Sequence, residues 1–463
     1  MKRLSVALCC VVCVFEALSG AAETPAEKAA RMAWWTESRF GMFIHFGLYS
    51  MPGRHEWVKM KEQIPEEKYE TYFKNFNPKD FDATAWAKAA KDAGMRYAVL
   101  TAKHHEGFCL WDTKETDYKI TRTPFGRDLV KEFVEAFRAE GLRVGLYYSL
   151  LDWHHPDYIV DASHPLHPKD PEWNDPKAYV ELNRGRDMSK YRAYMKRQVT
   201  ELLTQYGPID IMWFDFSYPR EDGLGKGRAD WDSEGLLKMA RSLAPNLIVD
   251  NRLDLIDTDW GWDFFTPEQF RPAHWVTRNG QRVPWETCQT FSGSWGYHRD
   301  ENTWKSPHQL IDLLIDTVSK GGNLIMNVGP TARGRFDARA LDRLDAYARW
   351  MDVNGRSVYG CTEAPAEFAA PENTMLTYNP GTKRLYVHLV TYPGARLACS
   401  FVDRVASAHF LHDGSEIELE RWGALPTHHQ KFYKSGCEGV SSFKLPALKP
   451  DVVNPVIECR IKQ

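Results

Sequence analysis

The sequence predicts an α/β protein: a (β/α) TIM-like barrel followed by a C-terminal antiparallel β-sandwich domain. Short apolar runs alternate with helical stretches over most of the chain, and these runs end in polar or aromatic side chains, as at the mouth of a barrel. From about residue 360 the pattern changes to short alternating runs separated by Pro and Gly turns. The 463 residues exceed the roughly 250 of a typical barrel, so we expect domains at 23–358 and 359–463.

The first 22 residues have the features of a targeting segment. Lys2 and Arg3 precede a mostly apolar stretch at 4–18, and small residues at 20–22 offer a cleavage site. We therefore predict a signal peptide at 1–22 and a mature protein in a periplasmic, secreted or lysosomal-type compartment. The later apolar runs are shorter than the roughly 18 residues that a spanning helix needs, so no membrane span is predicted.

Composition and cysteine spacing exclude several classes of function. The net charge of −3 and the pI near 6.6 give no basic field for nucleic acid or anionic lipid. The 17 Trp and 20 Tyr are consistent with stacking on sugar rings, although large cores also use them. No CxxC pair occurs after the leader, so a thiolate zinc site is not predicted, and the disulfide pairing stays open. The six cysteines concerned are Cys109, Cys288, Cys361, Cys399, Cys437 and Cys459.

Six apolar runs stand out as barrel strands, of the seven or eight that the pattern implies. They lie at 40–44, 97–101, 143–148, 208–215, 246–249 and 323–326. Carboxyl ends of parallel barrel strands meet at one face, where active sites of such barrels lie. The side chains at these ends are His45, Lys103, His104, His105, Asp152, Trp153, Asp215, Asp250, Asn251, Arg252 and Asn327.

The stretches between these runs have helical patterns. Apolar residues recur at helical spacing in the predicted helices, and Gly94 and Gly141 provide C-terminal stops. Ser306 and Pro307 have the residue types of an N-cap and a first helical position. The predicted helices lie at 24–39, 65–76, 81–94, 127–141, 186–206, from 306 to about 319, and 338–353.

The chain is organised around the run at 208–218, a strand that is apolar on both faces and carries a carboxylate at its exit. Asp215 lies between Phe214 and Phe216, an environment that would desolvate it. A lone aspartate in such a place can simply cap the following turn. Because neighbouring strands end in similar residues, the collective pattern favours a functional site.

Several motifs together resemble the retaining α-L-fucosidases of glycoside hydrolase family 29. The resemblance covers roughly residues 30–360, and the motifs occur in the order of that family. It implies a (β/α) barrel with a C-terminal β-sandwich, in agreement with the pattern above. The motifs are Arg39-Phe-Gly-Met-Phe-Ile-His-Phe-Gly47, Glu56-Trp57, Thr101-Ala-Lys-His-His-Glu-Gly107, Tyr147-Tyr-Ser149 with Asp152-Trp153, Trp213-Phe-Asp215, Trp285-Glu-Thr-Cys288, Ser294-Trp-Gly-Tyr297 and Ser319 to Pro330.

The resemblance assigns the two catalytic carboxylates. It implies that Asp215 is the nucleophile, which attacks the anomeric carbon and forms a glycosyl-enzyme ester. For the acid/base, two candidates stay open: Glu268, which we place first, and Glu286, which has the better-marked motif but is also explained as a structural carboxylate. A retaining outcome requires the two carboxyl groups about 5–5.5 Å apart. We expect the phenylalanines near Glu268 to desolvate it, namely Phe264, Phe265 and Phe270.

The resemblance also implies a set of sugar-binding positions. Neutral imidazoles donate and accept hydrogen bonds directionally, so three of them can fix a ring of hydroxyls, while Trp295 or Phe43 can contact the methyl group of fucose. Arg252 is the candidate cation beside Asp215. Metal ligation is the alternative for the histidines, but His104 and His105 are adjacent and should point to opposite faces of a strand. The substrate-binding candidates are His45, Glu56, Trp57, His104, His105, Tyr147, Arg252 and Trp295.

The leading hypothesis is therefore an exported, exo-acting α-L-fucosidase that retains anomeric configuration and needs no metal or other cofactor. Its expected partner is a fucosylated oligosaccharide or glycoconjugate. Three alternatives stay open: a related specificity such as α-L-galactose, a metal-dependent barrel hydrolase, and a sugar-binding protein without activity. The sequence does not predict the preferred linkage, the aglycone or the oligomeric state.

Overall fold

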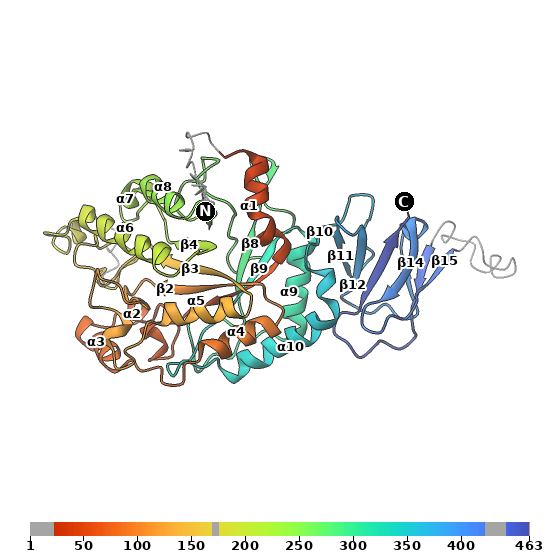
Figure 1. Cartoon of the computed structure of the whole chain (residues 1–463), viewed down its shortest axis with the longest axis horizontal. Coiled ribbons are helices and arrows are strands. Elements are labelled where there is room, and N and C mark those ends of the chain that lie inside the picture. The colour runs from red at the N-terminus through yellow and green to blue at the C-terminus, as the bar shows by residue number, and fades with distance from the viewer. Residues whose placement is uncertain (1–22, 169–175, 422–440, 463) are drawn as a thin grey trace, which may run out of the picture.

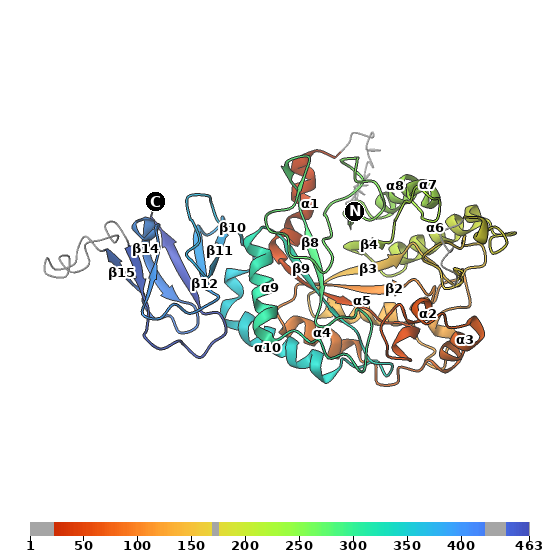
Figure 2. The same ribbon diagram turned by 180° about the vertical axis from the view of Figure 1, so that it is seen from behind.

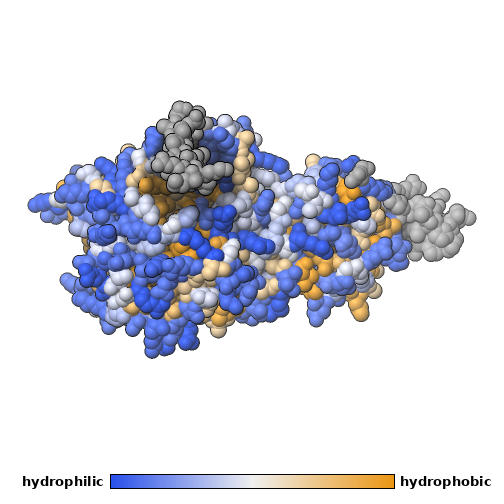
Figure 3. All heavy atoms as spheres, viewed as in Figure 1, coloured by the Kyte–Doolittle hydropathy of each residue, from blue (hydrophilic) through white to orange (hydrophobic). Residues whose placement is uncertain are grey.

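The computed structural model describes residues 23–168, 176–421 and 441–462, and within them the chain forms two parts (Figure 1). The larger part contains a parallel sheet with helices packed around it, and the smaller is an all-β unit at the C-terminal end. The predicted signal peptide and Cys437 lie outside the described residues. No helix among the described residues has the length and apolar character needed to cross a membrane. Hydrophilic residues predominate on the face seen in Figure 3.

Seven parallel strands form the sheet of the larger part, in the order β5-β4-β3-β2-β1-β9-β8. Parallel strands joined by helices bury both faces, and nearly every residue of these strands is buried. The predicted TIM-like barrel is thus confirmed, with a curled sheet of seven regular strands. The strands are β1 (Phe40–Ile44), β2 (Tyr97–Lys103), β3 (Arg143–Ser149), β4 (Ile211–Asp215), β5 (Ile248–Val249), β8 (Glu286–Thr290) and β9 (Asn323–Val328).

An irregular segment at 264–268 fills the gap between the edge strands β5 and β8. Phe264 bridges to Asp250 on one side, and on the other the nitrogen of Phe265 donates to the carbonyl of Pro284 at 2.9 Å. Glu268 bridges to Cys288 in the same parallel sense. The barrel is therefore closed by isolated bridges and not by an eighth regular strand.

The predicted helices are present within a few residues of their expected bounds. Ser306 accepts from the nitrogen of Gln309 as a helix N-cap, as its sequence predicts, and the side chain of Gln309 completes a capping box. The helices α2, α7 and α8 and the strand β8 were not predicted from the pattern. The helices are α1 (Pro25–Ser38), α2 (Val58–Lys61), α3 (Glu66–Asn75), α4 (Ala83–Asp92), α5 (Leu129–Ala139), α6 (Met188–Thr204), α7 (Arg228–Trp231), α8 (Ser233–Leu243), α9 (Pro307–Ser319) and α10 (Ala338–Asn354).

The inside of the barrel is packed with its own cluster of side chains. Alternate residues of each strand face inward, so aromatic and aliphatic groups from all around the sheet meet there. At the carboxyl end this packing becomes the floor of a pocket, because Phe43, Tyr147 and Trp213 reach the mouth. The buried members of the cluster are Met32, Trp35, Phe43, Tyr97, Val99, Tyr147, Ile211, Trp213, Ile248, Phe264, Cys288 and Ile325.

The C-terminal part contains two antiparallel sheets around a separate hydrophobic core, as predicted for a small sandwich. Figure 2 shows α9 and α10 between this part and the barrel strands, and Trp350 on α10 donates to the carbonyl of Val453 at 3.0 Å. The predicted boundary at residue 358 falls between α10 and β10. One sheet contains β10 (Thr362–Glu363), β11 (Thr374–Asn379), β12 (Arg384–Leu389), β17 (Val456–Ile461) and β14 (Val405–Phe410), and the other contains β13 (Arg396–Ala398), β16 (Ser441–Lys444) and β15 (Glu418–Arg421).

Candidate active site

One pocket at the carboxyl ends of the barrel strands brings together ten of the eleven candidate site residues. They come from the ends of β1 to β5 and from the segments at 56–57, 268 and 295, which are far apart in sequence. Glu286 is the exception and does not line this pocket. The ten residues are His45, Glu56, Trp57, His104, His105, Tyr147, Asp215, Arg252, Glu268 and Trp295, and Phe43, Trp213, Phe216 and Cys288 complete the wall.

Asp215 is the last residue of β4, and its side chain is only 11% exposed. The hydroxyl of Tyr147 donates to its Oδ2 at 2.7 Å, and Nη1 of Arg252 donates to its Oδ1 at 2.8 Å. His105 Nε2 lies 4.0 Å from Oδ2. The two donors fix the orientation of this carboxylate beside the pocket.

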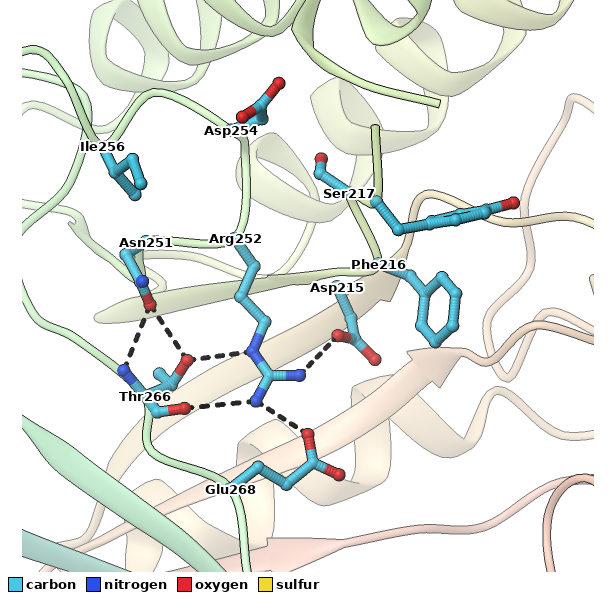
Figure 4. A pocket seen from close by; sticks show the side chains of 10 residues that line it. Asp215, Phe216, Ser217, Asn251, Arg252, Asp254, Ile256, Thr266 and Glu268 are labelled. Atoms are coloured by element: carbon cyan, nitrogen blue, oxygen red, sulfur yellow. Dashed lines mark hydrogen bonds and ion pairs between the residues drawn. The ribbon is translucent and has the colours of Figure 1, made fainter. Parts of the chain in front are cut away.

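Arg252 connects the two candidate catalytic carboxylates (Figure 4). Besides Asp215, its guanidinium binds Oε2 of Glu268 at 2.8 Å through Nη2 and donates to Oγ1 of Thr266 at 2.9 Å through Nε. Its plane also lies 4.5 Å above the ring of Trp213. Burial is the largest single effect and opposes its charge, but the surrounding acidic groups, Asp215 first among them, together outweigh burial and raise the pKa of Arg252. The planar guanidinium of Arg252 therefore holds both carboxylates beside the same pocket.

Glu268 lies on the irregular segment that closes the barrel, and its environment differs from the one expected. Its side chain is 41% exposed. Phe264 is buried inside the barrel, Phe265 packs on Trp262, and Phe270 is 61% exposed, so none of the three encloses the carboxylate. The expectation of desolvation by these phenylalanines was wrong, because one packs inside the barrel, one packs on Trp262 and one is exposed.

Glu286 lies at the opposite end of the barrel from the pocket. It is the first residue of β8 and is fully buried, and the hydroxyl of Tyr97, the first residue of β2, donates to it. Burial raises the pKa of Glu286 to about 7. The motif around this residue was clear in the sequence, but without the strand's bounds its position at the amino end could not be predicted. The geometry favours Glu268 as the acid/base candidate.

Three buried histidines form one wall of the pocket. His45 Nδ1 lies 2.6 Å from Oδ1 of Asn327, and His105 Nδ1 lies 2.7 Å from Oγ of Ser149, which fixes both rings. Burial lowers the pKa of His45 and of His105 to about 3 and that of His104 well below its ordinary value. The imidazoles are therefore neutral and each presents a nitrogen suited to a sugar hydroxyl.

His104 and His105 face the same pocket, contrary to the expectation from strand alternation. Their ring centroids are 4.1 Å apart. The strand β2 ends at Lys103, so the alternation stops before the pair. Over the described residues, no group of three or more His, Cys, Asp or Glu side chains is arranged to hold a metal ion.

Aromatic rings and a buried carboxylate shape the rest of the pocket. The ring of Trp57 lies 4.9 Å from that of His105, and the ring of Trp295 lies 5.1 Å from that of His45. Glu56 accepts from the backbone nitrogens of Trp295 and Gly296 at 3.1 and 2.9 Å, which positions the Trp295 segment. Burial raises the pKa of Glu56. Glu56 thus shapes the wall through the backbone it holds.

Phe216, which follows Asp215, contributes to the site in a way that the sequence did not indicate. Its φ is +81°, a left-handed conformation that is unfavourable for a residue with a Cβ. The ring consequently packs on His105 at 5.0 Å and on Trp57 at 5.3 Å. The sequence signal, two phenylalanines around an aspartate, suggested only a desolvated carboxylate.

Two carboxylates beside one pocket at the carboxyl mouth of a β/α barrel, with neutral imidazoles and aromatic walls, define a glycoside hydrolase. The family model of α-L-fucosidase matches residues 17–356. The human plasma α-L-fucosidase is 30% identical over 387 residues, which cover 78% of this chain and 76% of that protein. The α-L-fucosidase of Dictyostelium discoideum is 29% identical over 356 residues, 71% of each chain.

Solved structures give the same result. α-L-Fucosidase isoenzyme 1 from Paenibacillus thiaminolyticus is 42% identical, with a TM-score of 0.84 over 94% of this chain and 100% of that one. The family 29 α-L-fucosidase from Bacteroides thetaiotaomicron is 28% identical, with a TM-score of 0.75 over 96% of both chains. The chain belongs to the α-L-fucosidases of glycoside hydrolase family 29.

Proposed function

We propose that this enzyme removes terminal α-L-fucose from glycans by double displacement, with retention of anomeric configuration. The observation that carries the proposal is the pair of contacts from Arg252, 2.8 Å to Asp215 and 2.8 Å to Glu268, at one pocket. Retaining glycosidases need two carboxyl groups close enough to act on opposite sides of the anomeric carbon. The guanidinium of Arg252 contacts both carboxylates, and this common contact supports their pairing as nucleophile and acid/base.

In the first step Asp215 attacks the anomeric carbon while Glu268 donates a proton to the glycosidic oxygen. The bond to the aglycone breaks, the aglycone leaves as an alcohol, and the sugar is held as an ester of Asp215. In the second step Glu268, now ionised, takes a proton from water, and the resulting attack releases fucose and restores Asp215. Tyr147 and Arg252 stabilise the carboxylate of Asp215 before and after the ester exists.

Glu268 must carry a proton at the start of this cycle and give it up as the glycosidic bond breaks. A bound aglycone would cover a side chain that is 41% exposed, and loss of solvent favours the uncharged form of a carboxyl group. Once Asp215 is an ester it no longer neutralises Arg252, so the guanidinium then pairs with the ionised Glu268 alone.

The pocket wall supports recognition of a single terminal sugar. His45, His104 and His105 offer neutral ring nitrogens to secondary hydroxyls, and Trp295 and Phe43 offer apolar surface to a methyl group. The pocket is closed at its base by the packed barrel interior, so a sugar can enter only by its non-reducing end. This shape is the basis for the exo-acting assignment.

Solved relatives support a covalent mechanism for the family. In the Bacteroides thetaiotaomicron α-L-fucosidase, a covalent intermediate was trapped with 2-fluoro-fucosyl fluoride. The Thermotoga maritima α-fucosidase was solved in complex with a mechanism-based inhibitor. Export through a signal peptide at 1–22 remains part of this proposal, and plasma α-L-fucosidases are among the relatives.

Replacement of the proposed nucleophile tests the mechanism. Asp215→Gly should lose most turnover of an aryl α-L-fucoside, and azide should partly restore release of the phenol and give a β-fucosyl azide. Undiminished hydrolysis by Asp215→Gly would exclude Asp215 as nucleophile. Wild-type turnover of a panel of aryl glycosides, with α-L-galactoside beside α-L-fucoside, tests the sugar specificity in the same assay.

A further inference from the structure

A second cavity of about 410 Å³ opens beside the sugar pocket, large enough for a small-molecule site. It shares Asp215, Phe216, Arg252 and Glu268 with the sugar pocket, so the two spaces meet at the candidate catalytic carboxylates. The other residues that line it come from the segments after β4 and β5: Ser217, Tyr218, Asn251, Asp254, Ile256 and Thr266. We refer to this space as the outer cavity (Figure 4).

The position of Glu268 indicates what occupies the outer cavity. If Glu268 protonates the glycosidic oxygen, as proposed above, that oxygen lies at the junction of the two spaces. The sugar fills the inner pocket, and the group bonded to the oxygen extends into the outer cavity. The inference therefore rests on the proposed function, and it concerns the aglycone.

The charges around the outer cavity are unbalanced. Arg252 is the one cation among the ten residues that line it, and its guanidinium is already paired with Asp215 and Glu268. Asp254 adds a further carboxylate on the other side of Arg252 from Glu268, as Figure 4 shows. The nearby Arg228 pairs with Asp257 at 2.5 Å and also attracts Asp254, so one cation is shared by two carboxylates and the excess of negative charge remains. The wall therefore presents a net negative field to an aglycone.

Apolar and polar groups beside Asp254 complete a surface for a sugar-sized group. Ile256 lines the cavity although 45% of its surface is exposed. Asn251 is fixed by its Oδ1, which accepts from the nitrogen of Thr266 at 3.1 Å. An exposed aliphatic group and fixed polar groups around a cavity favour a ring with one apolar face and several hydroxyls.

We propose that Asp254 determines specificity by charge: the outer cavity accepts neutral or cationic aglycones and disfavours those that carry a carboxylate or a sulfate. Two like charges a few ångströms apart at a partly exposed site repel by an amount that changes rates several-fold, and salt screens the effect. Aglycones such as neutral or amino sugars meet no such penalty. Uronic acids and sulfated sugars do.

A structural role for Asp254 must be separated from this electrostatic one. Its Oδ2 accepts from the backbone nitrogen of Arg228 at 3.0 Å, at the start of the short helix α7. Asp254→Asn keeps a side-chain oxygen for that bond and removes the charge. A purely structural role would alter all substrates alike, so the ratio between a charged and a neutral substrate isolates the electrostatic contribution.

The experiment compares two aryl α-L-fucosides of nearly equal size, one with a 4-carboxylate and one with a 4-carboxamide. The quantity is the ratio of their kcat/KM values near pH 7, at low salt and again at about 0.5 M salt. Intrinsic leaving-group reactivity is the same for every enzyme variant, so it cancels when variants are compared. Asp254→Asn should raise the carboxylate-to-carboxamide ratio about three- to tenfold at low salt, and high salt should reduce that gain.

Two further variants make the test decisive. Ile256→Asp adds a charge to the same wall and should lower the ratio by a similar factor. Asp259→Asn makes the same charge change at a side chain that is fully exposed and does not line the cavity, and it should leave the ratio unaltered. A ratio that is the same in wild type, Asp254→Asn and Ile256→Asp at low salt overturns the charge selection. Absence of turnover of both fucosides by the wild type contradicts the proposed function itself.

Discussion

The hydroxyl of Tyr147 donates a 2.7 Å hydrogen bond to Asp215, its neighbour on the next strand of the barrel. In the parallel register of β3 and β4 the partner of Tyr147 is Trp213, and the hydroxyl of Tyr147 extends past that partner to Asp215 at the end of β4. It gives the candidate nucleophile a neutral donor on one oxygen, while Arg252 holds the other. The first prediction concerns this bond.

Tyr147→Phe should lower kcat/KM on aryl α-L-fucosides by roughly 10- to 100-fold, because a hydrogen bond to a charged group contributes about 1.5–3 kcal/mol. The ring would still stack on Trp213, so the fold should be retained. The matched control is Tyr148→Phe, which removes a 2.8 Å bond to Gln198 on the opposite face of the same strand. Its thermal stability should fall with little change in rate. Equal rate losses in the two variants would contradict a specific role for Tyr147.

Arg252→Lys should reduce kcat by roughly 100-fold or more, even though the charge is kept. A lysine ammonium is a point charge that cannot reproduce the fork binding Asp215, Glu268 and Thr266 together. Steady-state kinetics and a thermal melt measure the two consequences separately. If Arg252→Lys turns over at the wild-type rate, the shared guanidinium is not what positions the carboxylates.

Glu268→Ala should affect substrates according to their leaving group. Loss of a general acid costs roughly 10²–10⁴-fold for a poor leaving group and far less for an activated phenol. A plot of log kcat/KM against the pKa of the leaving phenol should therefore steepen in this variant. Glu286→Gln serves as the comparison, and a steeper plot for it would reverse our assignment of the acid/base.

Glu286 should make stability depend on pH between about 4.5 and 7. Burial raises its pKa from 4.5 to about 7, so over that range the folded state binds a proton that the unfolded state has lost. The free energy of unfolding consequently falls as pH rises, by up to about 3 kcal/mol for this group. Below 4.5 and above 7 this group adds no slope.

Glu286→Gln removes that contribution and should flatten the profile, as measured by denaturant unfolding at a series of pH values. Some slope of the same sign should remain, because burial also raises the pKa of Glu106 to about 7. A variant profile that is as steep as the wild type would show that Glu286 is not the source.

Two substitutions of Phe216, by glycine and by alanine, should separate the cost of its backbone conformation from the contribution of its ring contacts. Its left-handed φ of +81° costs a residue with a Cβ about 1 kcal/mol or more, and glycine avoids that cost. Phe216→Gly should therefore be more stable than Phe216→Ala, while both lose the ring packed on His105 and Trp57 and show a raised KM. Melting curves and KM values for the two variants provide the check. A glycine variant less stable than the alanine variant would contradict the strain.

The sequence predicted most of the barrel because strand ends and helix stops are local signals. Ser306 and Pro307 have the residue types of a helix start, and a helix begins at Pro307. Asp215 ends an apolar run, and that run forms a buried strand. β8 was not predicted as a strand because Glu286-Thr-Cys-Gln-Thr290 has neither an apolar run nor a clear alternation. Its place in the sheet comes from pairing with β9, a contact that no local pattern encodes.

The sequence predicted which residues line the pocket better than it predicted how they are arranged. Motif order placed His45, His104 and Asp215 at one mouth, and the structure brings them there. The sequence could not indicate that Glu286 begins its strand while Asp215 ends one, since a shift of a few residues moves a side chain from one end of the barrel to the other. Nor could it indicate the ion pair between Glu268 and Arg252, which depends on the path of an irregular segment.

That irregular segment has a practical consequence for protein engineering. Residues 264–268 pair with the adjacent strands only through isolated β-bridges, so we expect that this segment can be replaced without disturbing the regular pairing of the seven strands. The segment at 264–268 includes Glu268, the proposed proton donor, so alternative sequences grafted there should change the position of that carboxyl group relative to the glycosidic oxygen, while the histidine and tryptophan rings of the pocket stay in place. Variant libraries for the synthesis of new fucosylated products should therefore begin with residues 264–268.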